Sequence, residues 1–152
     1  MPRITPFLWF DDKAEEAMNH YISIFKNGKV LGAHRADGKV LTVTFELEGQ
    51  RFMGLNGGPL FRFTEAVSLF VDCDTQEEVD ELWEKLSAGG EKGKCGWLKD
   101  KYGLSWQIIP KALMQLMSDP DRRKSNAVMQ AMLKMNKIVI EDLKKAYESK
   151  AA

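Results

Sequence analysis

The sequence has few of the residues and segments that would tie it to a membrane, a metal or an oxidising compartment. It holds two cysteines, too few for the disulfide framework of a small secreted domain, and two histidines. No segment approaches the roughly 20 consecutive apolar residues that span a bilayer, and no basic, apolar leader opens the chain. The 22 basic residues balance the 22 acidic ones, so charge predicts neither nucleic acid nor an anionic membrane as a partner. We expect a cytoplasmic protein with reduced thiols.

What is present fits a folded globular protein. Of the 152 residues, 44% are hydrophobic and 29% are charged, a balance that is typical of a compact domain and not of disorder or a fibre. This length builds one domain with a substantial core.

The first part of the chain predicts the element order β-α-β-β-β. Residues 3–10 favour a strand, and Asp11 and Asp12 favour the start of a helix that ends at Gly28. Three strands are then expected at 29–36, 39–48 and 51–56, with the hairpin signal Asp37-Gly38 between the first two.

The same order begins again further along. A shift of 62 residues places Asp12 on Asp74 and Tyr21 on Trp83, which is the signature of an internal repeat. The second copy predicts a strand at 66–72, a helix that starts at Asp74 or Thr75 and stops at Gly89-Gly90, a weaker strand near 91–94, and hairpin strands at 94–99 and 104–109.

After Pro110 the apolar spacing becomes helical, and Asp119-Pro120-Asp121 separates the first two helices of this tail. We therefore predict an α+β fold with two tandem β-α-β-β-β modules and a C-terminal helical extension. The expected bounds are 1–110 for the paired modules, with copies at about 1–60 and 61–110, and 111–152 for the extension.

Short motifs spread over the first 110 residues carry a resemblance to a known family. They are Trp9-Phe10-Asp11 with Ala14-Glu15-Glu16-Ala17, Leu55-Asn56-Gly57-Gly58-Pro59, Thr75-Gln76-Glu77-Glu78-Val79-Asp80, and Cys95-Gly96-Trp97-Leu98-Lys99-Asp100 with Ser105-Trp106-Gln107. The chain resembles PhnB-like proteins, often labelled 3-demethylubiquinone methyltransferase domains, of the vicinal-oxygen-chelate (glyoxalase, bleomycin-resistance and dioxygenase) superfamily. The resemblance implies that each module curls its sheet into half of a cup, and that chains pair as homodimers.

In metal-dependent members of that superfamily, His and Glu side chains in the cup hold a divalent ion. Here Thr5 stands at the first ligand place and Gln107 at the last, and the inner pair falls near Met53 or Asn56 and near Ala66 or Ser68. Amides and hydroxyls bind transition metals far more weakly than imidazole or carboxylate. We expect no bound metal.

The methyltransferase label implies S-adenosylmethionine, which a glycine-rich turn after the first strand of a doubly wound sheet normally binds. The first strand here is followed by Asp11-Asp12-Lys13, and the glycine-rich segment Gly54–Gly58 runs into Pro59 and not into a helix. We expect no cofactor.

Neither histidine is placed for acid-base chemistry, since His20 falls within a helix and His34 within a strand, without an oriented partner. Strand alternation puts Ser105 and Gln107 on one face, expected to be the cup, and Trp106 on the other, beneath helices. The predicted ligand-binding residues are Trp9, Asn56, Ser68, Cys95, Trp97 and Gln107.

Tryptophan rings provide apolar walls for a flat ligand, and the two amides orient it. We expect a planar ligand, uncharged or weakly anionic, with Lys99 favouring a negative substituent. The leading hypothesis is therefore a small-molecule-binding protein with a metal-free cup, which includes an enzyme acting on an aromatic or quinone-like metabolite. Two alternatives stay open: a metal-dependent lyase or isomerase of the glyoxalase type, and a non-catalytic dimeric scaffold.

Overall fold

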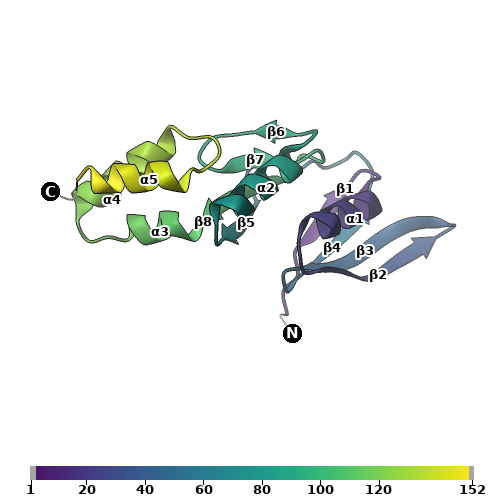
Figure 1. The fold of residues 1–152 in the computed structure, drawn as a ribbon. Coiled ribbons are helices and arrows are strands. Elements are labelled where there is room, and N and C mark those ends of the chain that lie inside the picture. Colours follow the sequence, from purple (N-terminus) through teal and green to yellow (C-terminus); the bar gives the residue numbers. More distant parts are fainter. Residues whose placement is uncertain (1–2, 151–152) are drawn as a thin grey trace. The chain divides into compact units, whose positions relative to one another are not determined.

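The computed structural model describes residues 3–150, which form two compact units that divide between Phe63 and Thr64. Each unit holds a four-stranded mixed sheet with one helix against it (Figure 1). No helix among residues 3–150 is long and apolar enough to cross a membrane.

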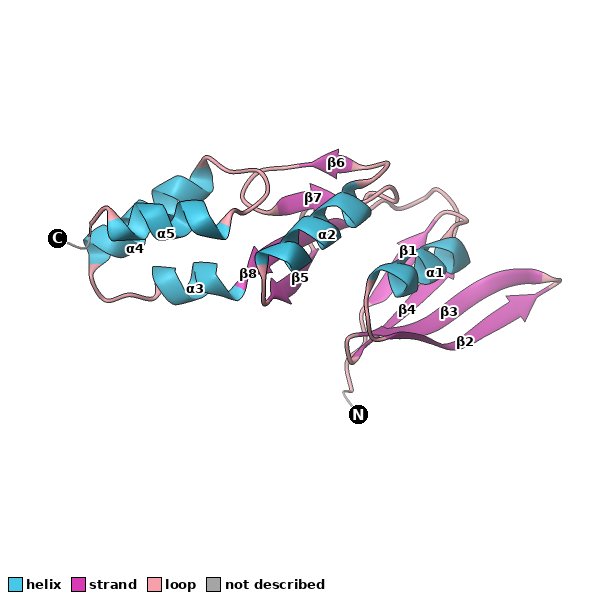
Figure 2. Cartoon of the chain, in the orientation of Figure 1, coloured by secondary structure: helices cyan, strands magenta, loops and turns pink. Residues whose placement is uncertain are grey.

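The first unit has the predicted order β-α-β-β-β. Its elements are β1 (Phe7–Phe10), α1 (Ala14–Ile24), β2 (Gly28–Ala36), β3 (Lys39–Leu47) and β4 (Gln50–Asn56). The strands lie in the order β1-β4-β3-β2, with β1 parallel to β4 and the other pairs antiparallel. Helix α1 packs on one face of this sheet (Figure 2), where alternate strand residues are buried: Leu8, Phe10, Val43, Phe45 and Phe52.

The second unit repeats this plan. Its elements are β5 (Ser68–Cys73), α2 (Gln76–Ser87), β6 (Glu91–Lys92), β7 (Trp97–Lys99) and β8 (Ser105–Pro110). The strand order β5-β8-β7-β6, with β5 parallel to β8, corresponds strand for strand to that of the first unit. Thr75 caps α2 by accepting a hydrogen bond from the Glu78 backbone N–H. The α+β fold with two tandem modules is confirmed.

The tail forms three helices that belong to the second unit: α3 (Lys111–Met117), α4 (Arg122–Leu133) and α5 (Ile140–Glu148). Apolar residues of these helices, and Ile138 between α4 and α5, meet the end of β8 in one cluster: Ile109, Leu113, Val128, Ile138 and Leu143. The predicted helical extension is therefore present, and its core continues from the last strand.

Several boundaries differ from the expectation. Strand β1 begins at Phe7 and not at residue 3, and α1 begins after Lys13, with no side-chain cap from the two aspartates. The expected strand 94–99 is shortened to Trp97–Lys99.

Cys95 therefore lies before this strand, with a left-handed φ of 58°. The tail explains the change, because the backbone N–H groups of Cys95 and Gly96 donate to the carbonyls of Met135 and Asn136 at 2.9 and 2.8 Å. A side chain at position 96 would also come within 2.7 Å of Ile109. The turn at Cys95 and Gly96 is therefore the place where the tail is hydrogen-bonded to the second module.

Candidate functional site

The second sheet has two chemically distinct faces. The face that packs against α2 is apolar and buried, and it carries Leu98, Trp106 and Ile108. Trp106 thus lies beneath a helix, as predicted. The opposite face, which we call the distal face, carries Ser68, Phe70, Trp97, Lys99, Ser105 and Gln107.

Strand register arranges these side chains in two rows across β5, β8 and β7. Gln107 is the partner of Phe70 on one side and of Trp97 on the other, so the first row is aromatic, amide, aromatic. The second row consists of Ser68, Ser105 and Lys99. Because the rows lie two residues apart along β8, they are separated by about 7 Å.

Two groups on the distal face have unused hydrogen-bonding capacity. Gln107 is half-buried, and its Nε2 donates to Ser68 Oγ at 2.9 Å; this is the one hydrogen bond of its side chain within residues 3–150. The Ser105 hydroxyl is wholly buried and has no hydrogen-bond partner in the described chain. Buried polar groups are normally paired, so an unpaired one needs a physical explanation.

An ion pair lies at the end of the second row. Lys99 Nζ is 2.8 Å from Glu65 Oε1, and both side chains are substantially exposed. The hydrogen bond and the charge of Lys99 lower the pKa of the Glu65 carboxyl, and Glu65 raises the pKa of Lys99 in return. The pair is therefore fully charged at neutral pH.

Trp9, in the first unit, also lies on the sheet face away from its helix. Its indole nitrogen donates to the Gly58 carbonyl at 2.9 Å, and its ring meets Phe61 edge to face with centroids 4.9 Å apart. Gly57 allows the ring to lie there, since a Cβ at that position would be 2.4 Å from it. Trp9 is thus held against the segment that follows β4.

Asn56 lies on the other face of the first sheet, toward α1. Its Oδ1 accepts from the Ala14 backbone N–H at 2.8 Å, and its Nδ2 donates to the Val40 carbonyl at 3.1 Å. The amide thereby supplies the cap that α1 otherwise lacks. This placement differs from the expectation, which grouped Asn56 with Trp9; alternation from Leu55, the register partner of Trp9, puts Asn56 on the α1 side.

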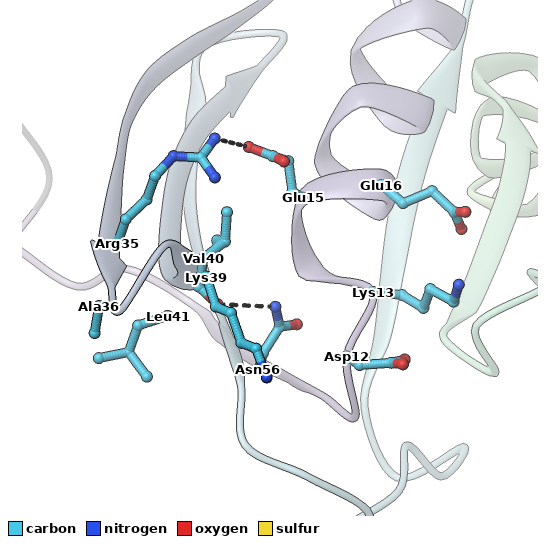
Figure 3. Close-up of a pocket in the computed structure, with 10 residues that line it drawn as sticks. All are labelled: Asp12, Lys13, Glu15, Glu16, Arg35, Ala36, Lys39, Val40, Leu41 and Asn56. Atoms are coloured by element: carbon cyan, nitrogen blue, oxygen red, sulfur yellow. Dashed lines mark hydrogen bonds and ion pairs between the residues drawn. The ribbon is translucent and has the colours of Figure 1, made fainter.

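Sequence reasoning missed a hollow beside Asn56 (Figure 3). It has a volume of about 750 Å³ and lies between the start of α1 and the β2–β3 hairpin. Arg35 crosses its rim to reach Glu15 at 2.8 Å. No sequence pattern links the hairpin to the helix start, so this feature depends on the tertiary fold. The lining residues are Asp12, Lys13, Glu15, Glu16, Arg35, Ala36, Lys39, Val40, Leu41 and Asn56.

The side chains at the metal-ligand places of related folds do not fit a transition metal. Gln107 uses its amide to bind Ser68, and Thr5 and Met53 bring no anionic or imidazole ligand. Across residues 3–150, no three His, Cys, Asp or Glu side chains gather in a group that could hold an ion. The absence of a bound metal stays a prediction.

The cysteines and histidines are not assembled for catalysis. Burial raises the pKa of the Cys73 thiol to about 12, which keeps it protonated. Cys95 is half-buried in the turn that receives the tail. His34 is exposed on the edge strand β2, and His20 is half-buried in α1. Nucleophilic chemistry therefore gains no support from these side chains.

Comparison with known proteins gives the family. Residues 2–109 match the model of the 3-demethylubiquinone-9 3-methyltransferase family. A PhnB protein from Bacillus cereus is 40% identical, with a TM-score of 0.68 over 72% of this chain and 99% of its own. A Pseudomonas aeruginosa protein of known structure is 18% identical, with a TM-score of 0.60 over 72% of this chain and 98% of its own, and shows a similar fold.

No match was found among curated proteins. The family model ends at residue 109, which leaves the helical tail outside its matched region. The chain belongs to the 3-demethylubiquinone-9 3-methyltransferase (PhnB-like) family.

Proposed function

We propose that this protein binds a planar small molecule, aromatic or quinone-like, on the distal face of its second sheet. The observation that carries the proposal is the row formed by Phe70, Gln107 and Trp97. Two aromatic side chains flank an amide whose carbonyl oxygen has no partner among residues 3–150. Aromatic walls with a few placed polar groups are typical of small-molecule sites.

The chemistry of this row suits a flat ligand. Phe70 is 52% exposed and Trp97 is half-buried, so both rings offer apolar area to a partner. Aromatic rings favour offset or edge-to-face contacts. The free carbonyl of Gln107 accepts one hydrogen bond from the ligand, and its second N–H donates one. The row therefore fixes both the plane and the direction of a bound molecule.

The first unit carries Trp9 and the exposed Phe7 on the corresponding face of its own sheet. We retain Ser68 in the proposed site of the second unit together with Trp97 and Gln107. Trp9 and Cys95 stay predicted ligand residues, because no hydrogen bond or ring contact among residues 3–150 joins them to a side chain of the distal face. Asn56 is less suited to ligand binding, because the oxygen and the nitrogen of its side-chain amide are both hydrogen-bonded to the backbone.

The name of the family is not sufficient reason to assign methyl transfer to this chain. A methyltransferase of the usual doubly wound kind binds its cofactor at a glycine-rich turn after a parallel strand. Here β1 leads into Asp11-Asp12-Lys13, and each sheet holds two antiparallel pairs for every parallel one. These features do not fit S-adenosylmethionine, and we assign no step to it.

A thermal-shift screen of aromatic and quinone-like metabolites tests the proposal, because a ligand that binds only the native state raises its melting temperature. Hits are then titrated by calorimetry against Trp97→Ala, Gln107→Ala and the control Gln130→Ala, which changes an exposed glutamine on α4. We expect each of the first two to cost about 1–3 kcal/mol of binding. Unchanged affinity in both, with the fold intact, would place the site elsewhere.

We also propose that the site works without a metal. Elemental analysis of protein purified without chelator is expected to find no stoichiometric transition metal. One tightly held Zn, Ni, Mn or Fe per chain would instead support the lyase or isomerase alternative.

Homodimer formation is the third part of the proposal. The edge strand β2 exposes Val30 and Leu31, and β1 exposes Phe7, and exposed apolar edges favour pairing between chains. Light scattering at micromolar concentration is expected to give about twice the 17.3 kDa of one chain. A particle of 17.3 kDa would contradict it.

A further inference from the structure

The second row of the distal face suggests which planar ligands are preferred. Ser68, Ser105 and Lys99 lie side by side on β5, β8 and β7. They offer the Ser68 hydroxyl and the Lys99 ammonium beside the wholly buried Ser105 hydroxyl, and no carboxylate lies on these three positions. The row is therefore a donor-rich strip beside the aromatic row.

The charge of this strip is neutralised from outside the sheet. Glu65, which binds Lys99, lies in the connecting segment before β5, where the Val67 N–H donates to the Thr64 carbonyl at 3.5 Å. Its side chain is 60% exposed, and exposed ion pairs contribute little to folding. Another carboxylate of similar geometry can therefore replace Glu65 on Lys99 at small cost.

We propose that Glu65 occupies, in the free protein, the place of an anionic oxygen group of the ligand, so that the preferred ligand class is an aromatic acid. This inference rests on the proposed function. The ring lies over Gln107 between Phe70 and Trp97, and its carboxylate lies toward Lys99 in the next row.

A ligand with two fused rings suits both rows. The rows are about 7 Å apart along β8, so the rings of a naphthalene carboxylate lie over the aromatic row while its carboxylate lies toward Lys99. The Ser105 hydroxyl is wholly buried and is not counted among the contacts of this ligand.

Specificity follows from this exchange of carboxylates. An acid gains the Lys99 ammonium when it displaces Glu65, whereas the matching amide gains no charge and leaves the Lys99–Glu65 pair intact. Glu65 thus competes with acids alone, and its removal should help acids and not amides.

The test compares 2-naphthoate with 2-naphthamide, which share size and shape but differ in charge. Binding to the full chain at neutral pH is followed through the Trp97 indole N–H in NMR spectra, assigned with Trp97→Phe, and by calorimetry. The variants are Glu65→Gln and Lys99→Met. The control is Glu84→Gln, which removes the carboxylate of the exposed Lys92–Glu84 pair on α2.

In the unmodified protein the acid exchanges one ion pair on Lys99 for another, so we expect only a small difference in affinity between the acid and the amide. Glu65→Gln should strengthen naphthoate binding about two- to fivefold, the change that an exposed ion pair supports, and leave naphthamide unchanged. Lys99→Met should weaken naphthoate binding and leave naphthamide binding unchanged, and Glu84→Gln should change neither.

Each other outcome is decisive. If both probes depend on Trp97 but Glu65→Gln affects neither, or affects both alike, the inference is wrong and the proposed function stands. If neither probe shifts the Trp97 signal at millimolar concentration, the aromatic row does not bind planar ligands, and both the inference and the function proposed for this face fail.

Discussion

The indole nitrogen of Trp106 donates a hydrogen bond to the carboxylate of Asp100 across 2.9 Å, and both side chains are buried. The other carboxylate oxygen accepts from the backbone N–H groups of Tyr102 and Leu104 at 2.9 and 3.0 Å. One carboxylate thus joins the turn between β7 and β8 to the face of β8 beneath α2. The distal face includes residues of the same two strands.

Replacing Asp100 should therefore destabilise the protein strongly. Asp100→Ala leaves three donors without their acceptor, and unpaired buried donors cost about 1–3 kcal/mol each, so we expect a loss of about 3 kcal/mol or more. Asp100→Asn keeps the shape but supplies one acceptor atom in place of two, so an intermediate loss is expected. Urea unfolding measures both. Asp142→Asn, on the exposed side of α5, is the control and should change little.

The sequence was sufficient to predict the modules because their signals are local. Hairpin residues such as Asp37-Gly38 and the alternation around Trp106 depend on neighbours within a few positions. The same alternation correctly separated Trp106 from Gln107.

Features that depend on distant contacts were not predictable. Cys95 lies in a turn because its backbone N–H donates a hydrogen bond to the carbonyl of Met135 in the tail, 40 residues later. Asn56 bonds Ala14, 42 residues earlier, and a lone asparagine after a strand carries no sign of such a partner. The Glu65–Lys99 pair joins a connecting segment to β7, and two opposite charges 34 residues apart predict nothing by themselves.

Ser105→Ala should not destabilise the free protein, although Ser105 is wholly buried. Its hydroxyl has no partner in residues 3–150, so its removal relieves a desolvated polar group and should leave stability equal or raised by up to about 1 kcal/mol. The matched control is Ser87→Ala, because the buried Ser87 hydroxyl donates to the Trp83 carbonyl at 2.6 Å. That variant should lose about 1 kcal/mol. Equal losses in the two would mean that Ser105 is hydrogen-bonded in solution.

The tail should respond to pH through Asp119 and Tyr147. The Tyr147 hydroxyl donates to Asp119 Oδ2 at 2.5 Å, which lowers the pKa of the Asp119 carboxyl and raises that of the Tyr147 phenol. A lowered acid pKa adds stability that is complete above its ordinary value of 3.8 and is lost as pH falls through the folded value. A raised phenol pKa adds stability that is complete below 10.0 and is lost above it.

The contribution of this pair is therefore greatest between those two values. Tyr147→Phe should unfold more readily than the unmodified protein at neutral pH, with the difference shrinking in acid. Chemical unfolding at several pH values measures it. A difference that stays constant into strong acid would show that Tyr147 acts through packing and not through Asp119.

The last prediction concerns how the tail is fixed to the second module. The Gln76 amide sits at the start of α2, where its Nε2 donates to the Ile138 carbonyl at 3.0 Å and its Oε1 accepts from the Ile140 N–H at 2.7 Å. It thereby satisfies a backbone group at the first turn of α5, which has no side-chain cap of its own. Lys137 adds an ion pair to Asp80 at 2.9 Å on the same side of α2.

Gln76→Ala should therefore loosen the tail without disturbing the sheet. We expect a loss of about 1–3 kcal/mol, whereas Glu77→Ala, one residue along and exposed, should cost far less. Leu143→Ala tests how much the apolar cluster contributes to fixing the tail. Leu143 is wholly buried, and such truncations cost about 2–5 kcal/mol of stability. Hydrogen exchange of the Ile140 amide separates the two roles: Gln76→Ala should raise its exchange rate more than that of the Leu143 amide. If Gln76→Ala and Glu77→Ala are equally mild, the apolar cluster alone holds the tail, and the Gln76 amide has no part in fixing it.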